Sequence, residues 1–199
     1  MTYRSIVAAA GLALASTSIA SQANADAVSY AIDPSHSQAI FSYNHLGMST
    51  TYGMFSGWEG EILFDEDAPE ASSVTVSIPT LAMFTGWEAR DDHFNSGDFL
   101  GTSEDDMVTF TSTSIEVTGD NTAMITGDLT INGTTNEVTL ETTMNFNGAH
   151  PSPNAGGAAA LGFTGTTQIL RSDFGAGAFA PFVSDEVEVT IEIEAMAAM

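Results

Sequence analysis

The sequence predicts an all-β fold, an antiparallel up-and-down β-barrel of about eight strands. Apolar and polar residues alternate over most of the chain, as expected for strands with one face in the interior and one in water. Short turn sequences separate these runs, and Asn132-Gly133 is the strongest hairpin signal among them. Several runs exceed about ten residues, which suits the tilted strands of a barrel better than those of a sandwich.

The first half of the chain predicts one short strand and three longer ones. The short strand is expected at 28–33, and the next strand at 37–46. A third, at 51–65, contains three glycines and ends at the turn-forming stretch 65–69. The fourth, at 72–80, has β-branched apolar residues at alternate positions, so one of its faces is expected to be buried.

Two stretches break the alternation. Residues 84–101 have no period of two, and we expect a short helix near 86–95 followed by a turn. Residues 148–157 are rich in Pro and Gly and predict a loop. Irregular segments at the ends of a barrel are where a mouth or a lid is expected.

The second half of the chain predicts five strands. They are expected at 107–118, 122–131, 135–147, 159–171 and 185–195. The alternation is clearest in the last of them, where Val187, Val189, Ile191 and Ile193 are separated by Glu and Thr. Thr, Val and Ile dominate all five runs, as is typical of strands.

Residues 1–25 have the features of a secretory signal peptide. An uncharged stretch at 5–15 precedes Ala23-Asn24-Ala25, the small-x-small pattern that signal peptidase recognises. The apolar stretch is too short to span a bilayer. We therefore expect cleavage near Asp26, export to the periplasm, no stable membrane insertion, and one folded domain over 26–199.

The composition is strongly acidic. The chain has 26 Asp and Glu against 3 Lys and Arg, a formal net charge of −23 at pH 7, and no Cys. Such a surface repels nucleic acids and anionic membranes, so neither is an expected partner. Without disulfides, the domain depends on packing and on the sheet ladder for its stability.

The interior of an eight-stranded barrel is either filled by side chains or open to one elongated ligand. Glycines within the strands fit both alternatives, because they mark bends or leave space. We expect an open lumen, lined mainly by odd-numbered residues of the later strands, with Gly165 as a small lining residue. The aromatic and Met candidates for the lining are Phe41, Tyr43, Tyr52, Met54, Phe55, Trp58, Met124, Met144, Phe146 and Phe163.

Arg90 and Arg171 are the only Arg or Lys residues after residue 25. Arg171 has the parity of Phe163, so its guanidinium is expected to face the interior and to need an anionic partner. Asp173, Asp91 and an anionic ligand are the candidates for that partner. The alternative is a structural Arg that ties a loop to the barrel end through a carboxylate.

His36, His45 and His93 are the other polar candidates. If the segment around Arg90 is helical, Arg90 and His93 share a face. His150 lies in the Pro/Gly loop and is taken as incidental. No metal-binding spacing and no catalytic motif occurs in the sequence, so we expect neither a metal site nor an enzyme.

Five segments, in order along the chain, resemble the YceI-like polyisoprenoid-binding family. They are YAIDPSHS at 30–37, continued by Phe41, His45 and Gly53-Met54-Phe55, then RDDHFNSGDF at 90–99, GDLTING at 127–133, RSDFG at 171–175 and VSDEV at 183–187. The resemblance implies a lipocalin-like periplasmic barrel whose lumen holds an amphiphile, such as a polyisoprenoid or a quinone tail. The chain departs from its relatives, which commonly carry surface Lys, in having none.

The resemblance and the lumen hypothesis together predict ten ligand-binding residues. They are His36, Phe41, Tyr43, His45, Phe55, Arg90, Asp91, His93, Phe163 and Arg171. The expected function is a periplasmic carrier or buffer of a long-chain lipid, with no cofactor besides that lipid and its head near the two arginines. Two alternatives stay open: a secreted stress-related structural barrel without ligand, and a hydrolase or isomerase acting on a lipid headgroup through His45 or His93.

Overall fold

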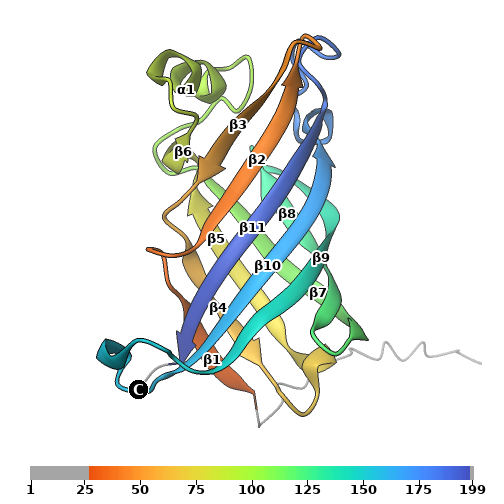
Figure 1. Ribbon diagram of the computed structural model, residues 1–199. Coiled ribbons are helices and arrows are strands. Elements are labelled where there is room, and N and C mark those ends of the chain that lie inside the picture. The colour runs from red at the N-terminus through yellow and green to blue at the C-terminus, as the bar shows by residue number, and fades with distance from the viewer. Residues whose placement is uncertain (1–26, 198–199) are drawn as a thin grey trace, which may run out of the picture.

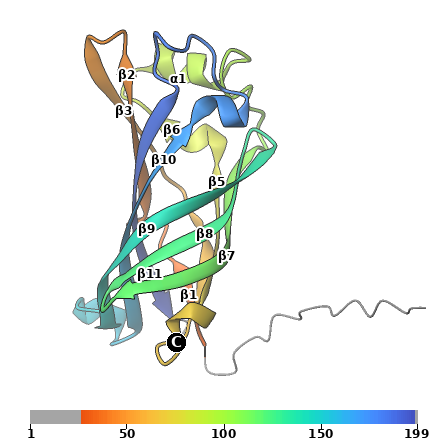
Figure 2. The same cartoon turned by 90° about the vertical axis from the view of Figure 1, so that its right-hand side faces the viewer.

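The computed structural model describes residues 27–197, and within them the chain forms a closed antiparallel β-barrel with one α-helix (Figures 1 and 2). The predicted fold class is confirmed. The expected signal peptide lies outside the described residues. The strands are β1 (Val28–Ile32), β2 (Gln38–His45), β3 (Ser49–Phe55), β4 (Glu59–Phe64), β5 (Ser73–Pro79), β6 (Met83–Phe84), β7 (Met107–Gly119), β8 (Thr122–Ile131), β9 (Thr134–Ala149), β10 (Ala159–Leu170) and β11 (Glu186–Ala197). The helix is α1 (Glu88–Asn95), and four short 3-10 helices are η1 (Pro69–Ala71), η2 (Thr80–Ala82), η3 (Pro153–Ala155) and η4 (Arg171–Phe174).

Eight strands close the barrel in the order β1, β4, β5, β7, β8, β9, β10 and β11, and β11 pairs with β1. All of these pairings are antiparallel. The other three strands extend one side of the wall. β2 continues along β11 where β1 ends, β3 pairs with β2, and β6 pairs with β3.

The two ends of the barrel differ. The end that we call the helix end carries α1, the β2–β3 hairpin and the loop between η4 and β11 (Figure 1). The opposite end, the far end, carries η1, the β7–β8 turn and the loop with η3 (Figures 1 and 2). No helix within residues 27–197 is long and apolar enough to cross a membrane.

The prediction of one continuous strand over 51–65 is wrong, because the chain bends between β3 and β4. Gly57 has a φ of +74°, a left-handed conformation that favours glycine, and it interrupts the ladder. Trp58 then turns inward, where its side chain is 3% exposed. The bend lets β3 pair with β2 while β4 pairs with β1.

Many of the buried apolar side chains lie on β1, β4 and β5. They form a cluster that includes Tyr30 and Ile32 on β1, Ile62 on β4, and Val76 and Ile78 on β5. Leu161 of β10 and Ala195 of β11 belong to the cluster as well, but most inward-facing residues of β8 to β11, such as Ile125, Leu140 and Ile191, pack against it and stay only partly buried. Part of the interior is therefore filled, and part is open.

The glycines within the strands have two different roles. A Cβ on Gly53 would lie 2.3 Å from Cζ of Phe41, and one on Gly127 would lie 2.5 Å from Cζ of Phe110. These two glycines leave room for an aromatic ring of the neighbouring strand. A Cβ on Gly165 would meet only Ile191 and Thr142 at 3.8–3.9 Å, which is ordinary contact. Gly165 thus has free space in front of it.

Candidate ligand-binding cavity

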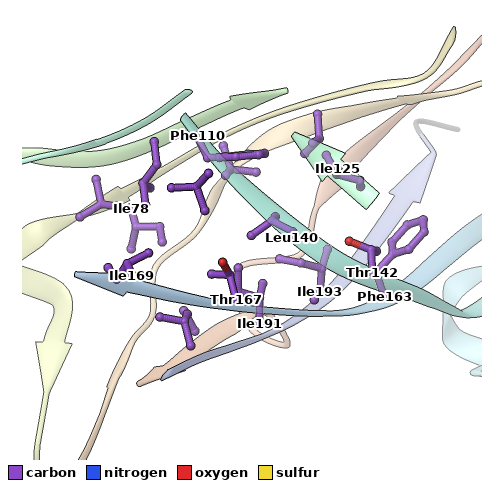
Figure 3. Close-up of a pocket in the computed structure, with 18 of the residues that line it drawn as sticks. Ile78, Phe110, Ile125, Leu140, Thr142, Phe163, Thr167, Ile169, Ile191 and Ile193 are labelled. Atoms are coloured by element: carbon purple, nitrogen blue, oxygen red, sulfur yellow. The ribbon is translucent and has the colours of Figure 1, made fainter. Parts of the chain in front are cut away.

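The barrel encloses a cavity of about 350 Å³ that is walled almost entirely by apolar side chains. Figure 3 shows these side chains pointing from opposite strands into a common space. The labelled residues are Ile78, Phe110, Ile125, Leu140, Thr142, Phe163, Thr167, Ile169, Ile191 and Ile193. Most of the Ile residues among them keep accessible surface although they face inward, because they border empty space instead of one another.

The period of two places these side chains inside. Odd-numbered residues line the cavity on β8, β10 and β11, as predicted, whereas β9 contributes even-numbered ones. In β7 the parity changes from Phe110 to Ile115, because the ladder with β8 shifts by one residue between Ser112 and Ser114. Such a bulge re-aims the side chains that follow it.

The cavity runs from the helix end toward the far end. Its far-end lining includes Pro69 and Ser72 beside residues 119–122 of the β7–β8 turn. The ladder between β5 and β7 ends at the pair Thr75 and Thr111, and beyond it β7 continues without β5. Because its lining extends from Phe99 at the helix end to Pro69 at the far end, the cavity is elongated along the barrel axis.

An aromatic cluster covers the cavity at the helix end. Phe94 of α1 makes edge contacts with Phe41 and Tyr43 of β2, at ring-centroid distances of 6.4 Å and 5.7 Å. Phe99, in the turn after α1, lies 5.0 Å from Phe94. All four rings line the cavity, so α1 and its turn form a cover over this end.

Arg171 is the one Arg or Lys among the lining residues. Its guanidinium donates hydrogen bonds to the carbonyl oxygens of Ser184 (2.9 Å), Val183 (3.0 Å) and Ala176. The group also lies 5.5 Å from the ring centre of Phe99. Burial lowers the pKa of Arg171, while Asp185 and Tyr43 counteract that shift. The guanidinium nevertheless stays charged.

Two of the three candidate partners of Arg171, Asp173 and Asp91, are wrong. Within the described residues neither Asp173 nor Asp91 forms an ion pair with it, because η4 and the following loop present carbonyl oxygens to the guanidinium instead. The backbone carbonyl of Asp173 accepts a bond from Asn136, and the carboxylate of Asp91 accepts bonds from Thr85. Arg171 ties a loop to the barrel end, but through neutral groups.

Arg90 has a separate place. Its Nε donates to Oγ1 of Thr85 at 2.8 Å and its Nη2 to the carbonyl of Thr85 at 2.5 Å. With Asp91 also bonded to Thr85, the three residues fix the start of α1. Neither Arg90 nor Asp91 lines the cavity. The two arginines are therefore not equivalent.

The three candidate histidines lie in three places, and none lines the cavity. His45 ends β2, where its backbone pairs with Val183. His93 lies 3.1 Å from the carboxylate of Asp98 and packs edge-on against Phe99. His93 and Arg90 thus have different partners, although both belong to α1.

His36 lies at the break between β1 and β2. Its Nδ1 is 2.8 Å from the carboxylate of Asp33 and 4.0 Å from that of Glu194. The hydrogen bond from His36, with one from Ser35, lowers the pKa of Asp33 to about 2, and Asp33 in turn raises the pKa of His36. One ligand atom from each of Asp33, His36 and Glu194 lies within 4.8 Å of the others, an arrangement that could accept a cation. His36 and Glu194 are exposed, Asp33 is partly buried, and the cluster lies outside the cavity.

The lining therefore contains half of the ten residues expected to bind ligand. Phe41, Tyr43, Phe55, Phe163 and Arg171 border the cavity, and the remaining five do not. Of the other aromatic and Met candidates, Trp58 and Met144 line it, whereas Tyr52, Met54, Met124 and Phe146 do not. Sequence reasoning missed Phe94, Phe99 and Met83, which lie in or beside the irregular segment and show no alternation.

A closed antiparallel barrel with an elongated apolar lumen defines a binding barrel of the lipocalin-like class. A family model described as YceI-like domain matches residues 30–195. The chain belongs to the YceI-like family.

Relatives and solved structures agree with that assignment. The chain is 40% identical to a UPF0312 protein of Ectopseudomonas mendocina over 189 residues, covering 94% of this chain and 96% of the relative. It is 37% identical to a UPF0312 protein of Pseudomonas aeruginosa, covering 93% and 95%. The Campylobacter jejuni YCEI protein superposes with a TM-score of 0.70 at 26% identity, covering 78% and 90%.

Two more distant structures share the fold. Burkholderia cenocepacia BcnA matches with a TM-score of 0.72 at 24% identity, covering 82% of this chain and 98% of that one. A polyisoprenoid binding domain from Saccharophagus degradans matches with a TM-score of 0.63 at 14% identity, covering 86% and 99%.

Proposed function

We propose that this protein binds a long-chain amphiphilic lipid, a polyisoprenoid or an isoprenoid quinone, in the lumen of the barrel and acts as its carrier or buffer. The observation that carries the proposal is the elongated apolar cavity, whose Ile and Leu side chains face inward and yet stay only partly buried. A filled structural barrel would have buried them against one another.

Burial of hydrocarbon supplies the affinity. Each CH₂ removed from water contributes about 0.8 kcal/mol, so every additional prenyl unit adds several times that amount. The lining from Phe99 at the helix end to Pro69 at the far end suits an extended chain better than a compact ligand. A solved structure of the same fold is described as a polyisoprenoid binding domain, which supports this ligand class.

The polar head of the lipid belongs at the helix end. Arg171 is the cationic group among the described lining residues, and Tyr43 lies close enough to it to influence its pKa. A head placed there stays near the aromatic cover and the surface, while the tail extends along the lumen. This orientation favours binding without catalysis, because His45 and His93, on which the hydrolase alternative depends, lie outside the lining.

We also propose that residues 1–25 direct export to the periplasm and are then removed. The small-x-small pattern at Ala23-Asn24-Ala25 is the support for this part of the proposal.

The test is to extract the purified protein with organic solvent and to identify co-purified lipid by mass spectrometry. We expect a prenyl lipid near equimolar amount in the wild type and a large loss in Gly165→Phe, whose ring occupies the free space beside Ile191. Thr166→Phe is the matched control, since the same ring is added to the outer face of the same strand.

Two results would count against the proposal. Equal lipid content in Gly165→Phe and Thr166→Phe would mean that the lipid does not occupy the lumen. Unfolding of Gly165→Phe, seen by circular dichroism, would indicate overpacking of a filled interior.

A further inference from the structure

At the helix end, four large apolar side chains of the β2–β3 hairpin and of the loop between η4 and β11 project into solvent, and we refer to these four as the tip surface. They are Leu46 (51% exposed), Met48 (81%), Phe179 (51%) and Phe182 (70%). We propose that the tip surface docks the protein on the surface of a neutral lipid bilayer. This inference concerns the outside of the molecule and does not depend on which ligand, if any, occupies the lumen.

The backbone brings the four residues together from two distant parts of the sequence. The amide of Leu46 donates to the carbonyl of Phe182 at 2.7 Å, and His45 pairs with Val183. The amide of Ser184 donates to the carbonyl of Asn44 at 2.9 Å. Figure 1 shows the β2–β3 hairpin and the loop before β11 together at the top of the barrel. Backbone hydrogen bonds therefore hold the hairpin and the loop against each other, and the tip surface is a defined part of the fold.

Two of the four residues are held in a costly backbone conformation. Leu46 has a φ of 58° and Phe179 a φ of 64°, both in the left-handed region that residues with a Cβ rarely adopt. Among the described residues Asn132 is the one other non-glycine with a positive φ, and it occupies a hairpin turn where such values are common. The hydrogen bonds between the hairpin and the loop hold the apolar side chains outward in spite of this cost.

The two segments that form the tip surface carry no charged side chain of their own, although the carboxylate of Asp98 lies close by, bonded to the His93 ring that packs against Phe179. The chain has 26 Asp and Glu, yet residues 38–58 and 174–184 contain none, and they contain no Lys or Arg either. Apolar segments without charged side chains can enter the interfacial region of a bilayer at low desolvation cost. With a net charge of −23, the rest of the protein is repelled by anionic lipids, so the complementary surface is a neutral one.

The tip surface is also continuous with the mouth of the cavity. The ring of Phe179 lies 5.6 Å from that of Phe99, which lines the cavity. Val183 and Ala176, in the same loop as Phe182, line it too. A bilayer in contact with the tip surface therefore faces the aromatic cover, while two copies of this acidic chain would repel each other across the same surface.

The experiment measures binding of the protein, in the form that export yields and with its N-terminus checked by mass, to phosphatidylcholine vesicles. We expect co-sedimentation of the wild type and a loss of at least about tenfold in the partition coefficient for Met48→Ser combined with Phe182→Ser. The matched control is Val28→Ser combined with Leu63→Ser, which removes two exposed apolar side chains at the far end and should leave binding unchanged. Retained binding of Nile red in the lumen shows that the variants are folded.

A second arm tests the role of charge. Vesicles with roughly one third phosphatidylglycerol should bind the wild type more weakly at low salt, and NaCl should restore binding. The proposal is overturned if the wild type does not bind phosphatidylcholine vesicles, if the tip variant binds as well as the control, or if phosphatidylglycerol strengthens binding. A concentration-dependent dimer that only the tip variant abolishes, without vesicle binding, would likewise overturn it and assign the surface to a second copy of the chain.

Discussion

Arg90 and Arg171, the two arginines of the described residues, have different roles, as their hydrogen-bond partners show. Arg171 borders the cavity and is bound by carbonyl oxygens of the loop before β11, whereas Arg90 is bound by Thr85 outside the cavity. Carbonyl oxygens satisfy the donors of a guanidinium without cancelling its charge. Arg171 therefore keeps a positive charge available to a ligand head.

From this arrangement we predict that Arg171→Gln weakens binding of a prenyl diphosphate by at least about tenfold, because the attraction between the anionic head and the one cationic group of the described lining is lost. Binding of a neutral quinone should change little. Arg90→Gln is the matched control: Arg90 lies outside the lining and acts only on the start of α1, so any change that it causes should be the same for both ligands. Fluorescence titration with both ligand types measures the effect, with circular dichroism as a check on folding. Equal losses for the charged and the neutral ligand would show that Arg171 is only a structural tie.

The pair of Asp33 and His36 predicts a pH dependence of stability. The pKa of Asp33 is lowered from 3.8 to about 2, so its contribution is present above pH 3.8 and lost as the pH falls toward about 2. The pKa of His36 is raised above 6.5, so its contribution is present below pH 6.5 and lost as the pH rises through the raised value. His36→Gln should thus lower the free energy of unfolding most between these limits. Urea unfolding across pH checks this, and a difference that stays constant into the alkaline range would contradict it.

At the scale of elements, the β2–β3 hairpin depends on a contact between a glycine and a ring. Phe41 lies over Gly53 so closely that its ring would supply each of the three nearest atoms to a Cβ added at that glycine. This contact holds Phe41 in the cavity wall beneath Phe94.

We predict that Gly53→Ala destabilises the protein by about 1–3 kcal/mol, as overpacking does. The loss should shrink in the background of Phe41→Leu, where the ring is absent. Gly165→Ala is the control and should cost nothing, because its new Cβ meets only ordinary contacts. Denaturant unfolding of the single and double variants gives the coupling energy. If the losses of unfolding free energy in the two single variants simply add up in the double variant, the cost of Gly53→Ala does not come from the ring of Phe41.

An element could be predicted where the sequence pattern that defines it lies within the element itself. Alternation is a local property, so β8, β10 and β11 could be predicted together with the side that they turn inward. The bend at Gly57 and Trp58 could not, because it depends on which neighbours β3 and β4 find around the barrel. The aromatic cover escaped prediction for a similar reason, since Phe94 and Phe99 meet β2 only through tertiary contacts.

At the scale of the whole molecule, charge and apolar surface are segregated. The cavity wall and the segments of the tip surface are nearly free of carboxylates, so most acidic residues of the described part lie on the remaining outer surface. Only three Lys and Arg in the sequence oppose them, and both arginines of the described part are bonded to neutral groups. Repulsion among carboxylates is thus relieved by ions of the solvent and hardly at all by ion pairs.

This segregation predicts a protein whose stability rises with salt. The folded state holds its acidic residues closer together than the unfolded chain does, so screening favours the folded state. The screening length falls from about 10 Å at 0.1 M to about 3 Å at 1 M ionic strength, which is shorter than most separations on such a surface. We expect the unfolding temperature to rise by several degrees between low salt and about 1 M NaCl. Differential scanning calorimetry measures this, and sucrose at equal osmolality is the control for solvent effects other than screening. A flat or falling temperature in NaCl would show that the carboxylates repel one another no more in the folded barrel than in the unfolded chain.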